Sequence, residues 1–168
     1  FYLELPLLDI NEKAEATRLL QKEAPIVNTT QDLHFDCTGK TILIVEDEKE
    51  LREYLIESFT GTFKKVYAAD NAISALETCR KKQPSIIVSD VMMPQMDGFE
   101  LCRQIKNDIR ISHIPVILLT ARYDQTGITT GYKSGADSYI PKPFDLAFLK
   151  VVVGNILKNR EKIHSQYV

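Results

Sequence analysis

Short apolar runs alternate with helical patterns through most of this 168-residue chain, and this alternation is what most constrains its fold. Five runs have the length and the branched apolar residues of β-strands. They lie at residues 41–45, 66–68, 85–89, 115–119 and 138–140. Between them, apolar residues recur at intervals of three and four, as in helices that pack through one face. The pattern predicts an α/β fold over residues 41–157, with helices on both faces of a parallel sheet.

The helical stretches are not equally well marked. The spacing is clear at residues 51–59, 72–79, 98–105 and 146–156. The stretch 123–134 is weaker because it contains Gly127 and Gly131, and each glycine inside a helix costs up to about 1 kcal/mol relative to alanine. We therefore expect a short, mobile or partly distorted helix between the last two strands.

Charge and cysteine usage exclude several classes of protein. The formal net charge of −2 provides no field that would attract nucleic acid or an anionic membrane. The basic residues Lys158, Arg160 and Lys162 are interpreted as a solvated helix end. The cysteines have no metal-ligand spacing, and Cys79 and Cys102 fall on apolar helix faces. Buried thiols suit a reducing compartment, so we expect a cytoplasmic location.

Acidic residues follow two neighbouring strands of the predicted sheet. Glu46 and Asp47 come directly after the first strand, and Asp90 ends the third. In an open parallel sheet, ligands bind outside the carboxyl ends of the strands. Three carboxylates there would repel one another unless a cation joined them, and oxygen ligands suit a hard divalent ion, Mg²⁺ first. The alternative is that Glu46 and Asp47 only cap the next helix, where acidic groups favour the positive end of the helix dipole.

The same edge carries groups suited to phosphoryl chemistry. A carboxylate beside a metal can attack phosphorus and form an aspartyl phosphate, which makes Asp90 the candidate nucleophile. Thr120 ends the fourth strand, where its hydroxyl can donate to a phosphoryl oxygen. Lys142 lies between two prolines after the fifth strand, so a rigid backbone would hold its ammonium near Asp90. Met92 and Met93 can be core residues, and we expect at least one of their side chains to be buried.

Together these residues resemble the receiver domain of two-component response regulators. The resemblance covers about residues 40–160 and consists of four separated motifs in the expected order. They are Glu46-Asp47, Asp90 with its Met-Met-Pro-Gln-Met-Asp-Gly tail, Thr120-Ala121 and Lys142-Pro143-Phe144. The resemblance implies a flavodoxin-like fold, a (βα)5 doubly wound parallel sheet with strand order 2-1-3-4-5.

The resemblance also implies the chemistry of the site. Glu46, Asp47, Asp90 and the backbone carbonyl of Met92 would hold Mg²⁺. Asp90 would accept a phosphoryl group from the phosphohistidine of a histidine kinase. The chain would then not be an enzyme in its own right, but a phosphoacceptor that assists its own phosphorylation and dephosphorylation.

Further residues acquire switching roles from the same resemblance. Thr120 would be the switch hydroxyl, Lys142 the cation that contacts the phosphoryl group, and Tyr139 the switch aromatic. A cis bond between Lys142 and Pro143 is also implied. Phosphorylation would draw Thr120 inward, let Tyr139 rotate and remodel the face formed by the fourth helix, the fifth strand and the fifth helix. Two copies of the chain can pair through that face.

Two positions in this family influence how water reaches the phosphoryl group. They lie two residues beyond the acceptor and two beyond the threonine, and here they are Met92 and Arg122. Neither side chain is a carboxylate or an amide that could align a water molecule. We therefore expect slow self-dephosphorylation.

The ends of the chain carry a shorter resemblance. Residues 1–7 are similar to the last strand of a histidine-kinase ATP-binding domain, and the chain opens at Phe1 rather than methionine. We expect a fragment of a hybrid sensor kinase, itself membrane-anchored in some architectures, with residues 8–40 as the linker to the receiver at 41–157. Residues 158–168 would extend the last helix toward an output module, by analogy one that controls transcription. The chain itself would contact neither nucleic acid nor membrane.

Two other functions remain as alternatives. One is an aspartate-nucleophile phosphatase on a similar sheet, but such enzymes usually carry a second aspartate two residues after the nucleophile, where this chain has Met92. The other is a receiver-like module that binds proteins without being phosphorylated. Such modules usually lack an acidic residue or the lysine, whereas this chain has the full set.

Overall fold

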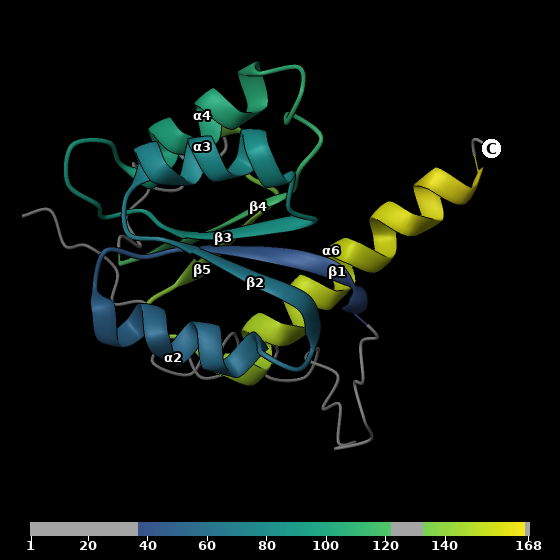
Figure 1. The fold of residues 1–168 in the computed structure, drawn as a ribbon, viewed down its shortest axis with the longest axis horizontal. Coiled ribbons are helices and arrows are strands. Elements are labelled where there is room, and N and C mark those ends of the chain that lie inside the picture. Colours follow the sequence, from purple (N-terminus) through teal and green to yellow (C-terminus); the bar gives the residue numbers. More distant parts are fainter. Residues whose placement is uncertain (1–36, 122–132, 167–168) are drawn as a thin grey trace, which may run out of the picture. The chain divides into compact units, whose positions relative to one another are not determined.

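The computed structural model describes residues 37–121 and 133–166, in which strands and helices alternate (Figure 1). The strands are β1 (Cys37–Val45), β2 (Phe63–Ala69), β3 (Ile86–Asp90), β4 (Val116–Thr120) and β5 (Ser138–Pro141). The helices are α2 (Lys49–Phe59), α3 (Ala72–Lys82), α4 (Gly98–Asn107) and α6 (Leu146–Gln166). The predicted kinase remnant, most of the linker and most of the weak helix at 123–134 lie outside the described residues.

The five strands form one parallel sheet in the order β2-β1-β3-β4-β5, so the predicted fold is confirmed. The register pairs Val45 with Ser89, and Asp90 with Leu119. The last strand is aligned in the same way, with Thr120 opposite Pro141. As a result, the residues that follow β1, β3, β4 and β5 meet at one end of the sheet, which we call the carboxyl edge. The end where the strands begin is the amino edge.

Two hydrophobic clusters cover the two faces of the sheet. Helices α3 and α4 lie on one face, and α2 and α6 on the other (Figure 1). The α3–α4 cluster packs these two helices on one face and includes Leu43, Val45, Leu76, Ile87, Leu101, Ile105 and Leu118. The α2–α6 cluster packs the other two helices on the opposite face and includes Ile42, Ile44, Leu55, Phe59, Val88, Ile117, Leu149, Val153 and Leu157. Successive strand residues point to opposite faces, so a sheet covered on both sides requires continuous apolar strands.

The strand boundaries differ from the predicted ones in an informative way. β1 begins at Cys37, before the predicted start at Thr41, because Cys37 pairs with Phe63 of β2. The residues between Cys37 and Thr41 include polar and exposed ones, so no apolar run marks this part of the strand. At the carboxyl edge, β3 and β4 each reach one residue further than the apolar run, to Asp90 and Thr120. Both site residues are therefore held by strand backbone.

Two of the helices begin at a residue whose side chain caps the first turn. Asn71 and Asp97 cap α3 and α4 by accepting hydrogen bonds from Ser74 N and Glu100 N, each at 2.8 Å. α6 continues without a break to Gln166, through the predicted extension. None of the helices in the described residues is long and apolar enough to cross a membrane. The three cysteines are free and buried, as predicted for Cys79 and Cys102.

Candidate functional site

Three carboxylates meet at the carboxyl edge, as the sequence predicts. Asp90 is the last residue of β3, and Glu46 and Asp47 directly follow β1. One oxygen from each group lies within 4.8 Å of the others. Glu46 and Asp90 are only 1% and 3% exposed, whereas Asp47 faces solvent. The adjacent β1–β3 register brings the acidic groups together although they are far apart in sequence.

Lys142 joins two of these carboxylates. Its Nζ lies 3.0 Å from Glu46 Oε2 and 3.0 Å from Asp90 Oδ1. Its backbone N–H donates to Thr120 O at 2.8 Å, which fixes the end of β5 against the end of β4. The Lys142–Pro143 peptide bond is cis, as predicted. A single cation therefore pairs with both the candidate nucleophile and an acidic neighbour.

The electrostatics of the site follow from burial and from these pairs. Burial, together with the nearby Asp90 charge, raises the pKa of Glu46, and the opposing effect of Lys142 does not cancel this shift. Burial alone would lower the pKa of Lys142. The hydrogen bonds and charges of Glu46 and Asp90 outweigh that effect, so the pKa of Lys142 is raised. Lys142 is therefore a firmly protonated ammonium at neutral pH.

The donor set fits a divalent cation. Asp90 Oδ1 is buried and, apart from the ion pair with Lys142, accepts no hydrogen bond from the described part of the chain. Three carboxylates face a single lysine ammonium here, which leaves an excess of negative charge and of oxygen ligands. An acidic cluster of this composition suits Mg²⁺, which binds few carboxylates and keeps several waters.

Helix capping explains only a small part of this arrangement. Glu46 Oε1 accepts from Glu48 N at 3.3 Å, while Oε2 faces Lys142. The residue that precedes the first turn of α2 is Glu48, and its own side chain makes no capping hydrogen bond. The capping alternative therefore accounts for one oxygen of Glu46 and leaves the convergence with Asp90 unexplained.

The structure describes Thr120, Met92 and Tyr139 among the other predicted site residues. Thr120 is buried at the end of β4. Met93 packs into the α3–α4 cluster, as expected for one of the two methionines, while the Met92 side chain is 53% exposed. Tyr139 is partly buried against the same cluster, and its hydroxyl lies 3.0 Å from Ser134 Oγ. Arg122 lies outside the described residues.

Sequence patterns missed two residues that shape the site. Arg52 Nη1 donates to the backbone carbonyls of Glu46 at 2.8 Å and Asp47 at 3.1 Å, and so holds the turn that carries both acidic groups. A cation near the first turn of a helix is unfavourable because it opposes the helix dipole, so the position of Arg52 in the sequence already indicated that it has another role. The second is Gly98, which ends the Met-Met-Pro-Gln-Met-Asp-Gly motif but whose role was not predicted. A Cβ there would lie 2.3 Å from Asp90 O, so only glycine lets α4 approach the end of β3.

Comparison with known proteins agrees with this geometry. The sequence model of the response regulator receiver domain matches residues 42–153, more than half of the chain. The chain belongs to the response regulator receiver domain family. The receiver is 41% identical over 140 residues to histidine kinase P4 of Formosa agariphila. This match covers 83% of this chain and 10% of that protein. The receiver is also 37% identical over 122 residues to the transcriptional regulatory protein AfsQ1 of Streptomyces coelicolor, which covers 73% of this chain and 53% of the regulator.

A solved structure gives the same result. The signal receiver domain of a signal transduction histidine kinase from Syntrophus aciditrophicus superposes with a TM-score of 0.66 at 36% identity. The match covers 72% of this chain and 92% of that domain. The chain is thus a receiver domain of two-component signalling, and it spans about a tenth and about half of the two curated relatives above.

Proposed function

We propose that this receiver accepts a phosphoryl group on Asp90 from the phosphohistidine of a histidine kinase, in a Mg²⁺-dependent reaction. The observation that carries the proposal is the position of Lys142 Nζ, 3.0 Å from both Asp90 and Glu46, inside a cluster of three carboxylates. An ion pair alone would need one acid and one base. The surplus carboxylates suit a site that gathers a metal and a phosphoryl group.

The chemistry is an in-line transfer. An oxygen of the Asp90 carboxylate attacks phosphorus, the new P–O bond forms as the P–N bond breaks, and the electron pair leaves with the imidazole nitrogen. Glu46, Asp47, Asp90 and the Met92 carbonyl would hold Mg²⁺, which offsets charge on the phosphoryl oxygens.

Lys142 and Thr120 complete the proposed site. The Lys142 ammonium already pairs with Asp90, and after transfer it would pair with a phosphoryl oxygen instead. The Thr120 hydroxyl would donate to another phosphoryl oxygen. Drawing Thr120 toward the phosphoryl group would free space for the Tyr139 ring, which now packs against the α3–α4 cluster. This rearrangement would remodel the face that includes β5 and α6, through which two copies of the chain would pair.

The wider assignment follows from the relatives. A hybrid histidine kinase as parent is supported by the similarity to a protein named histidine kinase P4. In this proposal residues 1–7 are the end of its ATP-binding domain, and the linker runs from residue 8 to the start of β1 at Cys37. Control of transcription is supported by the similarity to a transcriptional regulatory protein. Within this proposal the kinase is the phosphoryl donor, the chain is not itself an enzyme, it touches neither nucleic acid nor membrane, and it resides in the cytoplasm.

The decisive experiment is intact-mass measurement after incubation with acetyl phosphate and Mg²⁺. We expect one phosphoryl adduct on the wild-type chain and none on Asp90→Asn, because the amide cannot act as the nucleophile. Chelation of the metal should abolish the adduct. An equal adduct on Asp90→Asn, or none on either protein, would overturn the assignment. The exposed Met92 side chain offers no second carboxylate, so turnover of the adduct as in a phosphatase is not expected.

A further inference from the structure

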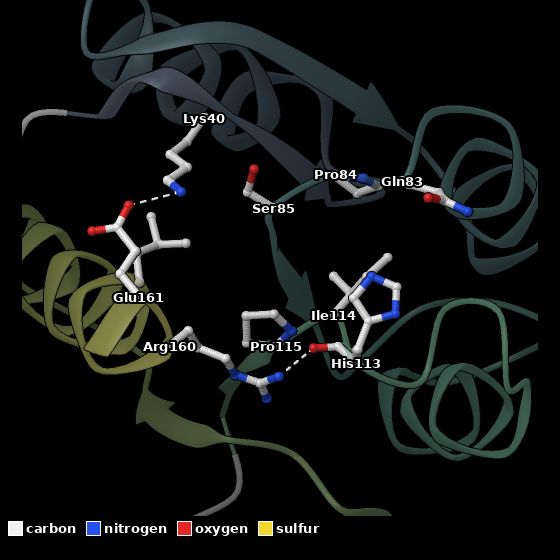
Figure 2. Close-up of a pocket in the computed structure, with 10 residues that line it drawn as sticks. Lys40, Gln83, Pro84, Ser85, His113, Ile114, Pro115, Arg160 and Glu161 are labelled. Atoms are coloured by element: carbon white, nitrogen blue, oxygen red, sulfur yellow. Dashed lines mark hydrogen bonds and ion pairs between the residues drawn. The ribbon is translucent and has the colours of Figure 1, made fainter. Parts of the chain in front are cut away.

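One turn of α6, at Arg160 and Glu161, is held against the amino edge of the sheet, the end opposite to Asp90. Arg160 Nη1 donates to the carbonyl of His113, just before β4, and Glu161 pairs with Lys40 of β1 at 2.8 Å (Figure 2). Arg160 Nη2 reaches Asp137 Oδ1 at 2.8 Å, directly before β5. The Arg160 side chain is 41% exposed and in addition makes these contacts, whereas Lys158 and Lys162 are exposed as expected.

These contacts surround a pocket of about 380 Å³ (Figure 2). Its charged walls, Lys40, Arg160 and Glu161, already have partners within the chain. The pocket is therefore best understood as the space beneath a tethered helix, and the tether itself is the feature that needs a role.

Asp137 is the centre of the tether. Its Oδ2 accepts hydrogen bonds from Lys106 Nζ of α4 and from the backbone N–H of Val116, each at 2.9 Å. Its Oδ1 accepts a hydrogen bond from Arg160 Nη2. The carboxylate is only 23% exposed. Burial would raise its pKa, but these donors outweigh burial, and the pKa of Asp137 is lowered. Charge-assisted hydrogen bonds in a partly buried place are stronger than exposed ion pairs.

The position of Asp137 in the chain gives the tether its meaning. It directly precedes β5, the strand that carries Tyr139, and β5 is followed by Lys142 of the acidic site. Its backbone N–H also donates to Val116 O at 2.8 Å, so Asp137 binds the first residue of β4 through both backbone and side chain. One residue thus joins the start of β5 to α4, β4 and the end of α6.

We infer that Asp137 is a positioning residue that couples β5 to the turn of α6 at Arg160, so that a shift of β5 on phosphorylation is passed to the end of this helix. The inference rests on the proposed function for its input, the shift of β5. A ligand can move α6 only if α6 has different contacts in the two states, and the Asp137–Arg160 pair is a contact that such a shift would change. The coupling would carry the signal from the carboxyl edge to the opposite edge of the sheet.

Hydrogen exchange of the full chain tests this inference, with and without Mg²⁺ and beryllofluoride as the phosphoryl analogue. Arg160→Met removes the contacts with Asp137 and with the His113 carbonyl, while Asp137 keeps Lys106 and Val116. We expect about fivefold faster exchange of the amides in residues 160–166 and loss of their response to beryllofluoride. Arg160→Lys should restore part of the response. Lys158→Met, a change on the same helix at an exposed lysine, should behave as wild type.

Each result decides one point. If the 160–166 amides exchange equally fast in wild type and Arg160→Met, the helix is not tethered and the inference is overturned. It is also overturned if Arg160→Met keeps a full response to beryllofluoride. If beryllofluoride changes nothing near Asp90 in the wild type, the proposed function fails, and the comparison without the analogue still decides whether the tether exists. The response to beryllofluoride distinguishes coupling from a merely structural contact. Loss of a merely structural contact would change the exchange measured without beryllofluoride but not the response to it.

Discussion

At the scale of single residues, the site depends on one cation shared by two carboxylates. Lys142 is held by Glu46 and Asp90 at equal distances of 3.0 Å, and their charges raise its pKa. The buried Glu46 has a raised pKa because Asp90 and burial oppose its charge. Such a centre is poised to exchange partners, since an arriving phosphoryl group would compete with Asp90 for Lys142.

The lifetime of the phosphorylated form is expected to depend on the side chain at position 92. Met92 is 53% exposed and cannot orient water, so Met92→Asn should speed hydrolysis of the aspartyl phosphate. One added hydrogen bond to water corresponds to an increase of up to about tenfold. The decay of the phosphoryl adduct, followed by intact mass after removal of the donor, measures it. Met92→Leu, which adds no polar group, should leave the decay rate unchanged. If Met92→Leu decays as fast as Met92→Asn, loss of the methionine rather than alignment of water is responsible.

Asp137 should give the protein a specific acid dependence. Its pKa is lowered below the ordinary value of 3.8, since the donors from Val116, Lys106 and Arg160 outweigh burial. Its contribution to stability is therefore present above pH 3.8 and is lost as the pH falls through the lower, folded-state pKa. The cations that face Asp137 are Lys106 and Arg160. Asp137→Asn should reduce the free energy of unfolding by about 1–2 kcal/mol at neutral pH.

Urea denaturation followed by circular dichroism between about pH 7 and pH 3 measures that dependence. The difference between wild type and Asp137→Asn should shrink as the medium becomes more acidic, and Arg160→Met should give an intermediate curve. A difference that stays constant with pH would mean that the Asp137 charge does not contribute through ionisation.

At the scale of secondary-structure elements, the strands and the acidic site could be predicted because their signals are local. Apolar runs mark strands covered on both faces, and Asp90 or Lys142 needs only its place at a strand end to be assigned. Arg52 and Asp137 could not be predicted in this way. Their partners are backbone groups and side chains brought together by tertiary packing, and no periodicity of residue types records such contacts.

The approach of α4 to β3 gives an element-scale prediction. A Cβ on Gly98 would lie 2.3 Å from Asp90 O and 2.9 Å from Val91 Cα, and both are backbone atoms that cannot rotate away. Gly98→Ala should therefore lower the free energy of unfolding by roughly 3 kcal/mol and slow phosphorylation of Asp90, because relief of the clash must shift the acceptor strand or α4. Thermal denaturation and the acetyl phosphate assay measure the two effects.

A second glycine provides the matched control. A Cβ on Gly39 in β1 would meet nothing within 4 Å, so Gly39→Ala should change stability by no more than about 0.5 kcal/mol. Equal losses in the two variants would show that the effect comes from replacing any glycine, rather than from the close approach of α4 to Asp90.

At the scale of the whole receiver, the two clusters define the part that must fold together. Both are built from the sheet and its helices, and the last member along the chain is Leu157. The turns of α6 beyond it contribute mainly polar contacts, Arg160 with Asp137 and Glu161 with Lys40. Folding and the chemistry at the carboxyl edge should therefore not require these turns, whereas the proposed coupling should.

Truncation after Asn159 tests that division. The shortened chain keeps both clusters, so it should unfold in one cooperative transition and still accept a phosphoryl group on Asp90. Loss of the two ion pairs should lower Tm by about 5 °C. The full-length double variant Arg160→Met and Glu161→Gln should lose the same amount, because it removes those pairs and keeps the helix. A truncated chain that fails to fold, or loses far more than the double variant, would show that the last turns of α6 belong to the folding core rather than to a tether laid upon it.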